Sequence, residues 1–380
     1  NEARMESNNK KRIYLSAPHL SQTTLEHIQE AIQQNWIAPV GPQLQSFEQL
    51  LSNYLHQKPV VALNSGTSAL HLALKLLGVQ KNDEVICPTF TFVASVNPVL
   101  YQQAIPIFVD SELQTWNICP VQLERAIQHR IQVSKKPKAI IVVHLYGQPA
   151  QMDAIRSIAQ RYNIPIVEDA AEALGSHYRG QKAGTLGDVG VISFNGNKII
   201  TTSAGGALVT QNTKQAEKAL FWVTQSKEDA PYYEHIEAGY NYRLSNVLAA
   251  IGVAQMGDLE HRVIQRRKIF EFYEASLPNY QLGFQPEMAG TLSNRWLTAM
   301  VLNQTTNSVT TETLRQALET ENIESRPLWK PMHLQPLFKD APYYGENIAE
   351  DLFNRGLCLP SGSALNSDDL HRIVQVISQV

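Results

Sequence analysis

Apolar runs alternate with amphipathic stretches along most of this chain, and this alternation constrains its fold more than any other feature. A short apolar run followed by a helix-length amphipathic stretch is typical of a βαβ unit, whose helices cover both faces of a parallel sheet. The sequence therefore predicts an α/β fold with a mostly parallel, seven-stranded sheet. The predicted strands are 60–63, 84–86, 105–109, 139–143, 164–168, 189–194 and 206–209.

The helical pattern and the chain length predict more than one domain. The predicted helices are 23–34, 44–54, 69–77, 92–101, 121–130, 152–162, 214–222 and 246–274. The last helix leads into a smaller α+β region with a strand at 296–302 and a helix at 311–321. Since 380 residues exceed what one core usually supports, we expect an N-terminal segment 1–20, a large domain 21–275 and a small domain 276–380. Residues 1–4 precede Met5 and are compatible with an expression tag.

Composition and charge exclude several classes of protein. A formal net charge of −3 gives no reason to expect a nucleic acid or an anionic membrane as partner. The cysteines Cys87, Cys119 and Cys358 have no metal-ligand spacing, so we expect buried free thiols, no metal site and a reducing, cytoplasmic compartment. We find no apolar run long enough for a membrane span and no signal-peptide pattern. Neither a dinucleotide-binding nor a P-loop motif occurs.

One lysine and one aspartate are spaced as pyridoxal phosphate chemistry requires. Glu168 and Asp169 close the apolar run 164–167, and Lys198 follows 29 residues after Asp169. A lysine that forms a Schiff base, downstream of an acid at the end of a buried strand, is the pair on which this cofactor depends. An isolated lysine is ordinarily only solvated, so the pair alone is a weak signal.

A small-residue turn supplies the third element. Residues 64–70 read Asn-Ser-Gly-Thr-Ser-Ala-Leu and connect a predicted strand to a predicted helix. Backbone N–H groups at such a turn, together with the helix dipole, favour a phosphate, although an ordinary helix N-cap has the same residues. Because ligands of open α/β sheets lie beyond the carboxyl ends of the strands, Asp169 and this turn are expected to face one pocket. There Asp169 can keep a pyridine nitrogen protonated.

With these elements in order, the chain resembles the fold-type I pyridoxal phosphate enzymes, and among them the DegT-type nucleotide-sugar aminotransferases. The resemblance covers nearly the whole length and rests on the blocks 15–19, 64–74, 88–95, 167–175, 194–206 and 239–246. It implies Lys198 and Asp169 as catalytic residues. It implies as cofactor-binding residues Gly66, Thr67, Ser68, Phe92, Asp169, Glu172, Ser193, Asn195, Lys198 and Asn241.

Some of these roles have a simpler alternative. Phe92 is expected to stack on the cofactor ring and Ser193 to bind its phosphate, while Glu172 can equally be structural. In the family, the asparagine matched by Asn241 reaches across a dimer interface, which implies a homodimer with shared sites. Arg243 near a phosphate would be a strong contact, but an ion pair with an acid explains it as well.

The resemblance also implies the substrates. The amino donor is expected to be L-glutamate and the acceptor a nucleotide-linked 4-keto-6-deoxy sugar aminated at carbon 4, with ping-pong kinetics. The block 323–333 is most similar to that of enzymes acting on UDP-4-keto-6-deoxy-N-acetylglucosamine in bacterial diamino-sugar biosynthesis for surface glycans and polysaccharides. The family resemblance as a whole implies these substrate-binding residues: Trp36, Gly41, Arg243, Arg326, Lys330 and His333. Arg326 and Lys330 would neutralise the diphosphate, unless they are only surface charges.

Four alternatives stay open. The acceptor can be a dTDP- or GDP-linked sugar or a 3-keto sugar, and an amino-acid-metabolising relative is a further possibility. The sugar dehydratase branch carries histidine in place of the lysine, so Lys198 argues against it. A regulator on the same scaffold would be expected to lose Lys198 or Asp169, and this chain keeps both.

Overall fold

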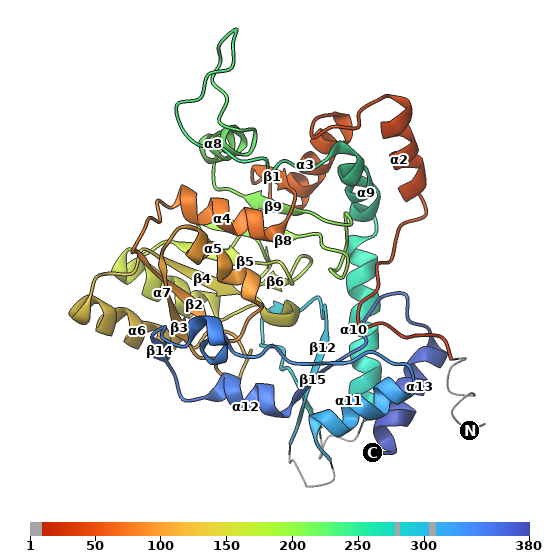
Figure 1. Cartoon of the computed structure of the whole chain (residues 1–380). Coiled ribbons are helices and arrows are strands. Elements are labelled where there is room, and N and C mark those ends of the chain that lie inside the picture. The colour runs from red at the N-terminus through yellow and green to blue at the C-terminus, as the bar shows by residue number, and fades with distance from the viewer. Residues whose placement is uncertain (1–9, 278–281, 304–308) are drawn as a thin grey trace.

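The computed structural model describes residues 10–277, 282–303 and 309–380 (Figure 1). All seven predicted strands form, most within two residues of their predicted bounds. The main sheet has the order β1 (Val60–Leu63), β9 (Gly206–Val209), β8 (Val189–Ser193), β5 (Ile166–Asp169), β4 (Ala139–Val143), β2 (Glu84–Pro88), β3 (Ile105–Val109) and β14 (Tyr343–Tyr344). Residues 1–4, the suggested tag, lie outside the described residues.

The sheet is mostly parallel, as predicted, and it has one strand more than the seven predicted. Strands β8, β5, β4, β2 and β3 run parallel, whereas β9 pairs antiparallel with both β1 and β8. The eighth strand, β14, comes from the C-terminal part and pairs parallel with β3. It has only two residues, too few for a periodic pattern, which is why the sequence did not indicate it.

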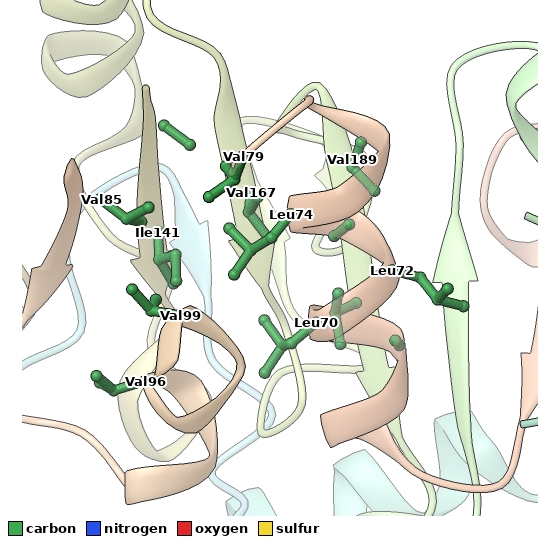
Figure 2. Close-up of a cluster of buried hydrophobic side chains, with 14 of the residues drawn as sticks. Leu70, Leu72, Leu74, Val79, Val85, Val96, Val99, Ile141, Val167 and Val189 are labelled. Carbon is green, nitrogen blue, oxygen red and sulfur yellow. The ribbon is translucent and has the colours of Figure 1, made fainter. Parts of the chain in front are cut away.

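Helices cover both faces of this sheet because successive strand residues point to opposite sides. Ile141 packs under helix α4 (Gly66–Leu76), in the cluster that Figure 2 shows. Its neighbours Ile140 and Val142 pack on the other face against α6 (Pro120–Val133) and α7 (Met152–Tyr162). Both faces are thus buried, as the continuous apolar strands predict.

Two predicted helices are interrupted. The predicted helix 92–101 is a short 3-10 turn, Val93–Ser95, followed by α5 (Asn97–Tyr101), since Pro98 cannot donate a backbone hydrogen bond inside a helix. The predicted helix 246–274 consists of α9 (Asn246–Met256) and α10 (Leu259–Ser276). The remaining helices are α2 (Thr24–Gln33), α3 (Pro42–Tyr54), α8 (Thr213–Val223), α11 (Thr311–Thr320), α12 (Ile348–Arg355) and α13 (Ser367–Ser378), with short 3-10 turns at Leu145–Gly147, Met332–Leu334 and Pro336–Phe338.

A second sheet forms near the C-terminus. Its four antiparallel strands have the order β10 (Leu282–Phe284), β12 (Thr298–Leu302), β15 (Gly356–Leu359) and β13 (Arg326–Pro327). The core against this sheet includes Ile13 near the N-terminus and Ile269 and Tyr273 of α10, so it draws on both sides of the predicted boundary at 275/276. Helix α10 runs from the main sheet down to α11 and α13 in Figure 1. The division into domains stays a prediction.

Three smaller features complete the fold. A three-stranded sheet joins β11 (Thr291–Leu292), β6 (His177–Tyr178) and β7 (Gln181–Lys182). The three cysteines are free thiols, but only Cys87 and Cys358 are fully buried; Cys119 caps α6 and is partly exposed. In the described ranges no helix combines the length and the apolar character needed to cross a membrane.

Candidate active site

A cavity of about 300 Å³ opens at the carboxyl ends of the central strands. It brings together eight of the predicted site residues from four separate stretches of the chain, namely Gly66, Thr67, Phe92, Asp169, Glu172, Ser193, Asn195 and Lys198. Its volume lies at the lower end of the range for ligand pockets. The side chains that the sequence predicts to face one pocket therefore do line a common cavity.

The turn before α4 leaves helix N–H groups free to bind an anion. The Ser65 hydroxyl caps the helix by accepting the N–H of Ser68 at 3.1 Å. The Ser68 hydroxyl donates to the Asn64 side chain at 2.6 Å, so Ser68 serves the cap and does not line the cavity, contrary to its predicted cofactor contact. The N–H groups of Gly66 and Thr67 begin the helix and have no partner within it. The turn is thus an N-cap that also leaves two N–H groups available to an anion.

Tight packing holds this turn against the sheet. A Cβ on Gly206 would lie 2.4 Å from the backbone nitrogen of Gly66, and a Cβ on Gly66 would lie 3.1 Å from the Cβ of Ser193. A side chain at Gly206 would displace the turn, and one at Gly66 would press against Ser193. The Ser193 hydroxyl is therefore placed beside the free N–H groups by backbone packing.

Asp169 ends β5 and is 4% exposed. Its carboxylate accepts the Ser95 hydroxyl at 2.8 Å and the N–H of Ala171 at 3.1 Å. Burial raises the pKa of Asp169, and these two hydrogen bonds act in the opposite direction. A buried carboxylate at the wall of a cavity is stabilised by a positive group placed opposite it.

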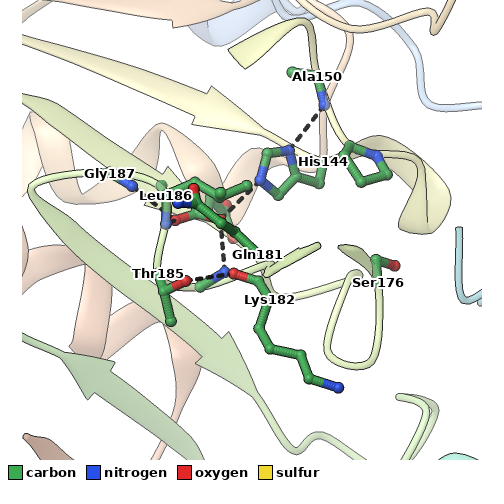
Figure 3. A network of polar contacts seen from close by, with 12 residues as sticks. His144, Ala150, Ser176, Gln181, Lys182, Thr185, Leu186 and Gly187 are labelled. Carbon is green, nitrogen blue, oxygen red and sulfur yellow. Dashed lines mark hydrogen bonds and ion pairs between the residues drawn. The ribbon is translucent and has the colours of Figure 1, made fainter. Parts of the chain in front are cut away.

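The preceding residue, Glu168, anchors the end of β5 on the other face of the sheet. Its carboxylate accepts the N–H groups of Gly184 and Leu186 at 2.5 Å and of Gly187 at 2.9 Å. His144 lies 2.9 Å away through Nε2, and its Nδ1 accepts the N–H of Ala150 at 3.0 Å (Figure 3). Since Nδ1 accepts a hydrogen bond, Nε2 carries the proton and donates a hydrogen bond to the Glu168 carboxylate.

We did not predict this network. Its signal in the sequence is a glutamate and a histidine, each next to an uninterrupted apolar run. Both side chains are fully buried, so the network rigidly fixes the strand end from which Asp169 projects.

Lys198 projects into the cavity between an acid and an indole ring. Its Nζ lies 3.9 Å from the nearer Glu172 oxygen and 3.9 Å from the centre of the Trp296 ring. Burial lowers the pKa of Lys198 and raises that of Glu172 to about 7. Glu172 also accepts the N–H of Tyr146 at 2.6 Å. A lysine with a depressed pKa is suited to act as nucleophile and as base.

Three aromatic residues, Phe92, Trp296 and Trp329, also line the cavity. The rings of Phe92 and Trp329 are tilted to each other at 5.1 Å, and Tyr146 stacks with Trp329 at 6.1 Å. Tyr146 has a left-handed backbone, with φ of +53°, which directs its N–H to Glu172 while its hydroxyl accepts the N–H of Trp329 at 2.9 Å. We predicted Phe92 as a residue of this site, but we did not single out Tyr146.

A second cavity, of about 720 Å³, adjoins the first, because Asn197 and Trp329 line both. Arg326 and Lys330 lie on its wall. The Arg326 guanidinium is largely exposed and pairs with Glu324 at 3.0 Å. The structure thus places these two predicted substrate residues next to the first cavity.

The structure does not bring five other predicted residues into either cavity, namely Trp36, Gly41, Asn241, Arg243 and His333. Arg243 forms a two-pronged ion pair with Glu48 and also donates to the carbonyl of Ala62 at 3.1 Å, so its guanidinium is engaged as a structural ion pair. His333 contacts the Thr89 hydroxyl at 2.6 Å, and its ring stacks on Tyr343.

Trp36 and Gly41 belong to a loop that Asn246 fixes. The Asn246 side chain donates to the Trp36 carbonyl at 2.9 Å and accepts the N–H of Leu44 at 3.0 Å. Gly41 has a φ of +150°, and a Cβ there would collide with Asn246 at 2.5 Å. The conformation of this loop therefore requires a glycine at position 41. Asn241 is exposed, and its carbonyl accepts the Asn64 side chain at 3.3 Å.

The donors in the first cavity fit pyridoxal phosphate. Free helix N–H groups and the Ser193 hydroxyl match a phosphate, a buried carboxylate at Asp169 matches a protonated pyridine nitrogen, and Phe92 offers a ring face. Lys198 supplies the amine. The phosphate, the pyridine nitrogen, the ring face and the aldehyde of the cofactor therefore each have a counterpart in the wall.

Comparison with known proteins agrees with this fit. The model of the DegT/DnrJ/EryC1/StrS aminotransferase family matches residues 18–378. The chain is 49% identical over 372 residues to EpsN of Bacillus subtilis (strain 168), which is assigned as a pyridoxal phosphate-dependent aminotransferase; the match covers 97% of this chain and 95% of EpsN. It is 36% identical to the GDP-perosamine synthase of Escherichia coli O157:H7, over 95% of this chain and 96% of that enzyme.

A solved structure shares the whole architecture. The DegT DnrJ EryC1 StrS aminotransferase from Brucella abortus superposes with a TM-score of 0.87 at 30% identity, covering 94% of each chain. The chain therefore belongs to the DegT/DnrJ/EryC1/StrS aminotransferase family and is a pyridoxal phosphate-dependent aminotransferase.

Proposed function

We propose that this enzyme transfers the amino group of L-glutamate to carbon 4 of a nucleotide-linked 4-keto-6-deoxy sugar, namely UDP-4-keto-6-deoxy-N-acetylglucosamine. The reaction would serve bacterial glycan or polysaccharide biosynthesis in the cytoplasm. The observation that carries the proposal is the meeting of Lys198, Asp169 and the free N–H groups of the α4 turn at one cavity, with a second, cation-bearing cavity beside it.

Each residue of the first cavity has a defined task in this proposal. Pyridoxal phosphate supplies an aldehyde that accepts the amino group and a ring that withdraws electrons. Lys198 holds the cofactor and, once released, moves a proton from the donor's α-carbon. Asp169 keeps the pyridine nitrogen protonated, while Gly66, Thr67 and Ser193 bind the phosphate.

The second cavity is proposed to receive the nucleotide. Arg326 and Lys330 bring two positive charges within its wall, which suits a diphosphate. The preference for UDP rests on the resemblance of the block 323–333. A GDP-linked keto sugar is the second candidate, because a relative at 36% identity is a GDP-perosamine synthase.

We further propose a homodimer whose sites are shared. The fixed loop 36–41 exposes Trp36, Ile37 and Val40 as an apolar patch, and Asn241 is exposed beside the anion turn. Exposed apolar side chains that cluster on an ordered loop are typical of an interface. Asn241 would then reach the cofactor phosphate of the partner.

Subunit exchange tests the shared site. Asn241→Ala and Lys198→Ala homodimers are mixed after each is shown to be impaired, and mass-tagged chains verify exchange. If Asn241 serves the partner's site, the mixed dimer has one intact site and activity returns. Absence of activity despite exchange would contradict the shared site and leave the aminotransferase activity in place.

A panel of nucleotide sugars tests the substrate. The enzyme is incubated with L-glutamate and UDP-, dTDP- or GDP-linked 4-keto and 3-keto sugars, and the products are identified by mass and by sugar ring couplings in NMR. We expect amination at carbon 4 of the UDP sugar. Amination of only a GDP-linked sugar would replace this proposal by the second candidate, and transfer to 2-oxo acids alone would refute both.

A further inference from the structure

Arg266, on α10, is a buried cation without an acidic partner. Its side chain is 1% exposed, and no carboxylate of the described ranges pairs with it. Burial lowers the pKa of Arg266 to about 9, so the guanidinium remains charged at neutral pH. Burying an unpaired charge costs free energy of folding, so a buried cation without an ion pair indicates a functional role.

The hydrogen bonds of Arg266 lead to two residues near Lys198. One terminal nitrogen donates to the carbonyl of Trp296, and the other donates to the Ser16 hydroxyl at 2.9 Å. The Nε is buried and has no hydrogen-bond partner in the described structure. The guanidinium therefore holds the segment before α2 and the segment before β12 together.

Ser16 and Trp296 then converge on the residue that precedes Lys198. The Ser16 hydroxyl donates to the carbonyl of Asn197 at 2.6 Å, and the Trp296 indole N–H donates to the same oxygen at 2.7 Å. The ring of Trp296 also lies 3.9 Å from Lys198 Nζ. The peptide that carries Lys198 is thus fixed from one side by two donors, and both are held by Arg266.

We propose that Arg266 is a positioning residue: through Ser16 and Trp296 it fixes the Asn197 carbonyl, and it brings a positive charge to the segment that carries Lys198. This inference rests on Lys198 as the cofactor-bearing lysine and extends the site to α10. It assigns a use to a buried charge that no ion pair explains.

The charges around Lys198 have opposing effects. Asp169 and Glu172, at and after the end of β5, raise the pKa of the Lys198 amine, whereas Arg266 on α10 and burial lower it. If the charge of Arg266 is removed, only burial still opposes the two carboxylates, so the pKa of Lys198 should rise. The amine would then be protonated when it must take a proton.

Competitive acetylation of Lys198 tests the charge. The enzyme is loaded with pyridoxamine phosphate, which leaves the lysine amine free, and the extent of Lys198 acetylation is measured against pH by peptide mass spectrometry. We expect Arg266→Met to move the midpoint upward, which lowers the labelling of Lys198 at neutral pH. Arg266→Lys keeps the charge, and its midpoint should stay near that of the wild type.

Arg262→Met is the matched control. Arg262 lies one turn earlier on α10 and is 4% exposed, but it pairs with Asp258 at 3.1 Å. It should leave the Lys198 midpoint in place. A folded Arg266→Met enzyme with the wild-type midpoint, or an equal shift in Arg262→Met, would overturn the proposal.

Ser16→Ala tests the positioning even if Arg266→Met does not fold. It removes one of the two donors to the Asn197 carbonyl, so kcat should fall about threefold to tenfold, the equivalent of one hydrogen bond, with KM unchanged. An unchanged kcat would contradict the positioning role. The labelling needs no substrate, so its failure is distinct from a failure of the proposed sugar specificity.

Discussion

The two adjoining cavities are built in different ways. Around Lys198 the charged groups are buried and held by main-chain contacts: Asp169 is 4% exposed, and Glu168 behind it accepts three backbone N–H groups. In the second cavity the side chain of Arg326 is 68% exposed and pairs only with Glu324. The first region is preorganised for one cofactor, whereas the second can adjust to its ligand.

This difference predicts unequal consequences of substitution. Removing a buried, hydrogen-bonded group leaves its partners unsatisfied, which costs more free energy than removing an exposed group. Exposed cations contribute about 1 kcal/mol or less each. Substitutions in the first cavity should therefore affect the rate of the reaction, and substitutions in the second should affect binding of the sugar nucleotide.

Lys198→Ala should have the largest effect and abolish turnover. The variant loses the amine that holds the cofactor and moves the proton, but the phosphate and pyridine contacts remain. It should therefore still bind pyridoxamine phosphate, as measured by equilibrium dialysis. Residual turnover near the wild-type rate would break the comparison, because the preorganised cavity would then not contain the essential base.

Asp169→Asn should come second, with turnover reduced about tenfold to hundredfold. The substitution keeps the shape but removes the charge opposite the pyridine nitrogen, and a hydrogen bond to a charged group contributes about 1.5–3 kcal/mol. Steady-state kcat is the measurement. The buried neighbour variant Ser95→Ala, which removes one hydrogen bond to Asp169, should lose less. Near wild-type kcat in Asp169→Asn would exclude this residue from the site.

Arg326→Ala and Lys330→Ala should each raise KM for the sugar nucleotide about twofold to fivefold, with little change in kcat. The reason is that these exposed cations are proposed to contact the diphosphate and not the reacting atoms. Arg315→Ala is the control, because Arg315 is a partly exposed arginine on α11 that pairs with Glu312 away from both cavities. A fall in kcat at constant KM would show that the second cavity takes part in the chemical step.

The smallest effect concerns stability. In the cofactor-free protein the pKa of Glu172 is raised to about 7 from an ordinary 4.5, so the folded chain holds a proton that the unfolded chain releases. Stability contributed by this group is therefore lost as pH rises through that window, by about 1 kcal/mol between pH 6 and 7. Urea unfolding should show this loss in the wild type and a weaker pH dependence in Glu172→Gln. Equal dependence would contradict the raised pKa.

The two regions also differ in what the sequence predicted. Strand ends and the anion turn are local patterns, so spacing made Asp169, Gly66 and Lys198 candidates, and the family resemblance then implied their roles. Contacts between distant segments have no such pattern. The bond from Ser16 to Asn197 joins residues 181 positions apart, and the ion pair that engages Arg243 joins it to Glu48.

Short or interrupted elements were not predicted from the sequence, for related reasons. Strand β14 has two residues, and the break between α9 and α10 falls where no proline marks it. The role of Tyr146 depends on a positive φ at a non-glycine residue, which only the surrounding packing imposes. Tertiary contacts, and not local preference, decide these features.

The most direct test of the account is the identity of the cofactor-bearing residue. The purified enzyme, loaded with pyridoxal phosphate, is reduced with borohydride, digested and mapped by mass spectrometry. We predict the pyridoxyl group on Lys198. A pyridoxyl group on another lysine, such as Lys182 or Lys214, would contradict the assignment of this cavity as the active site.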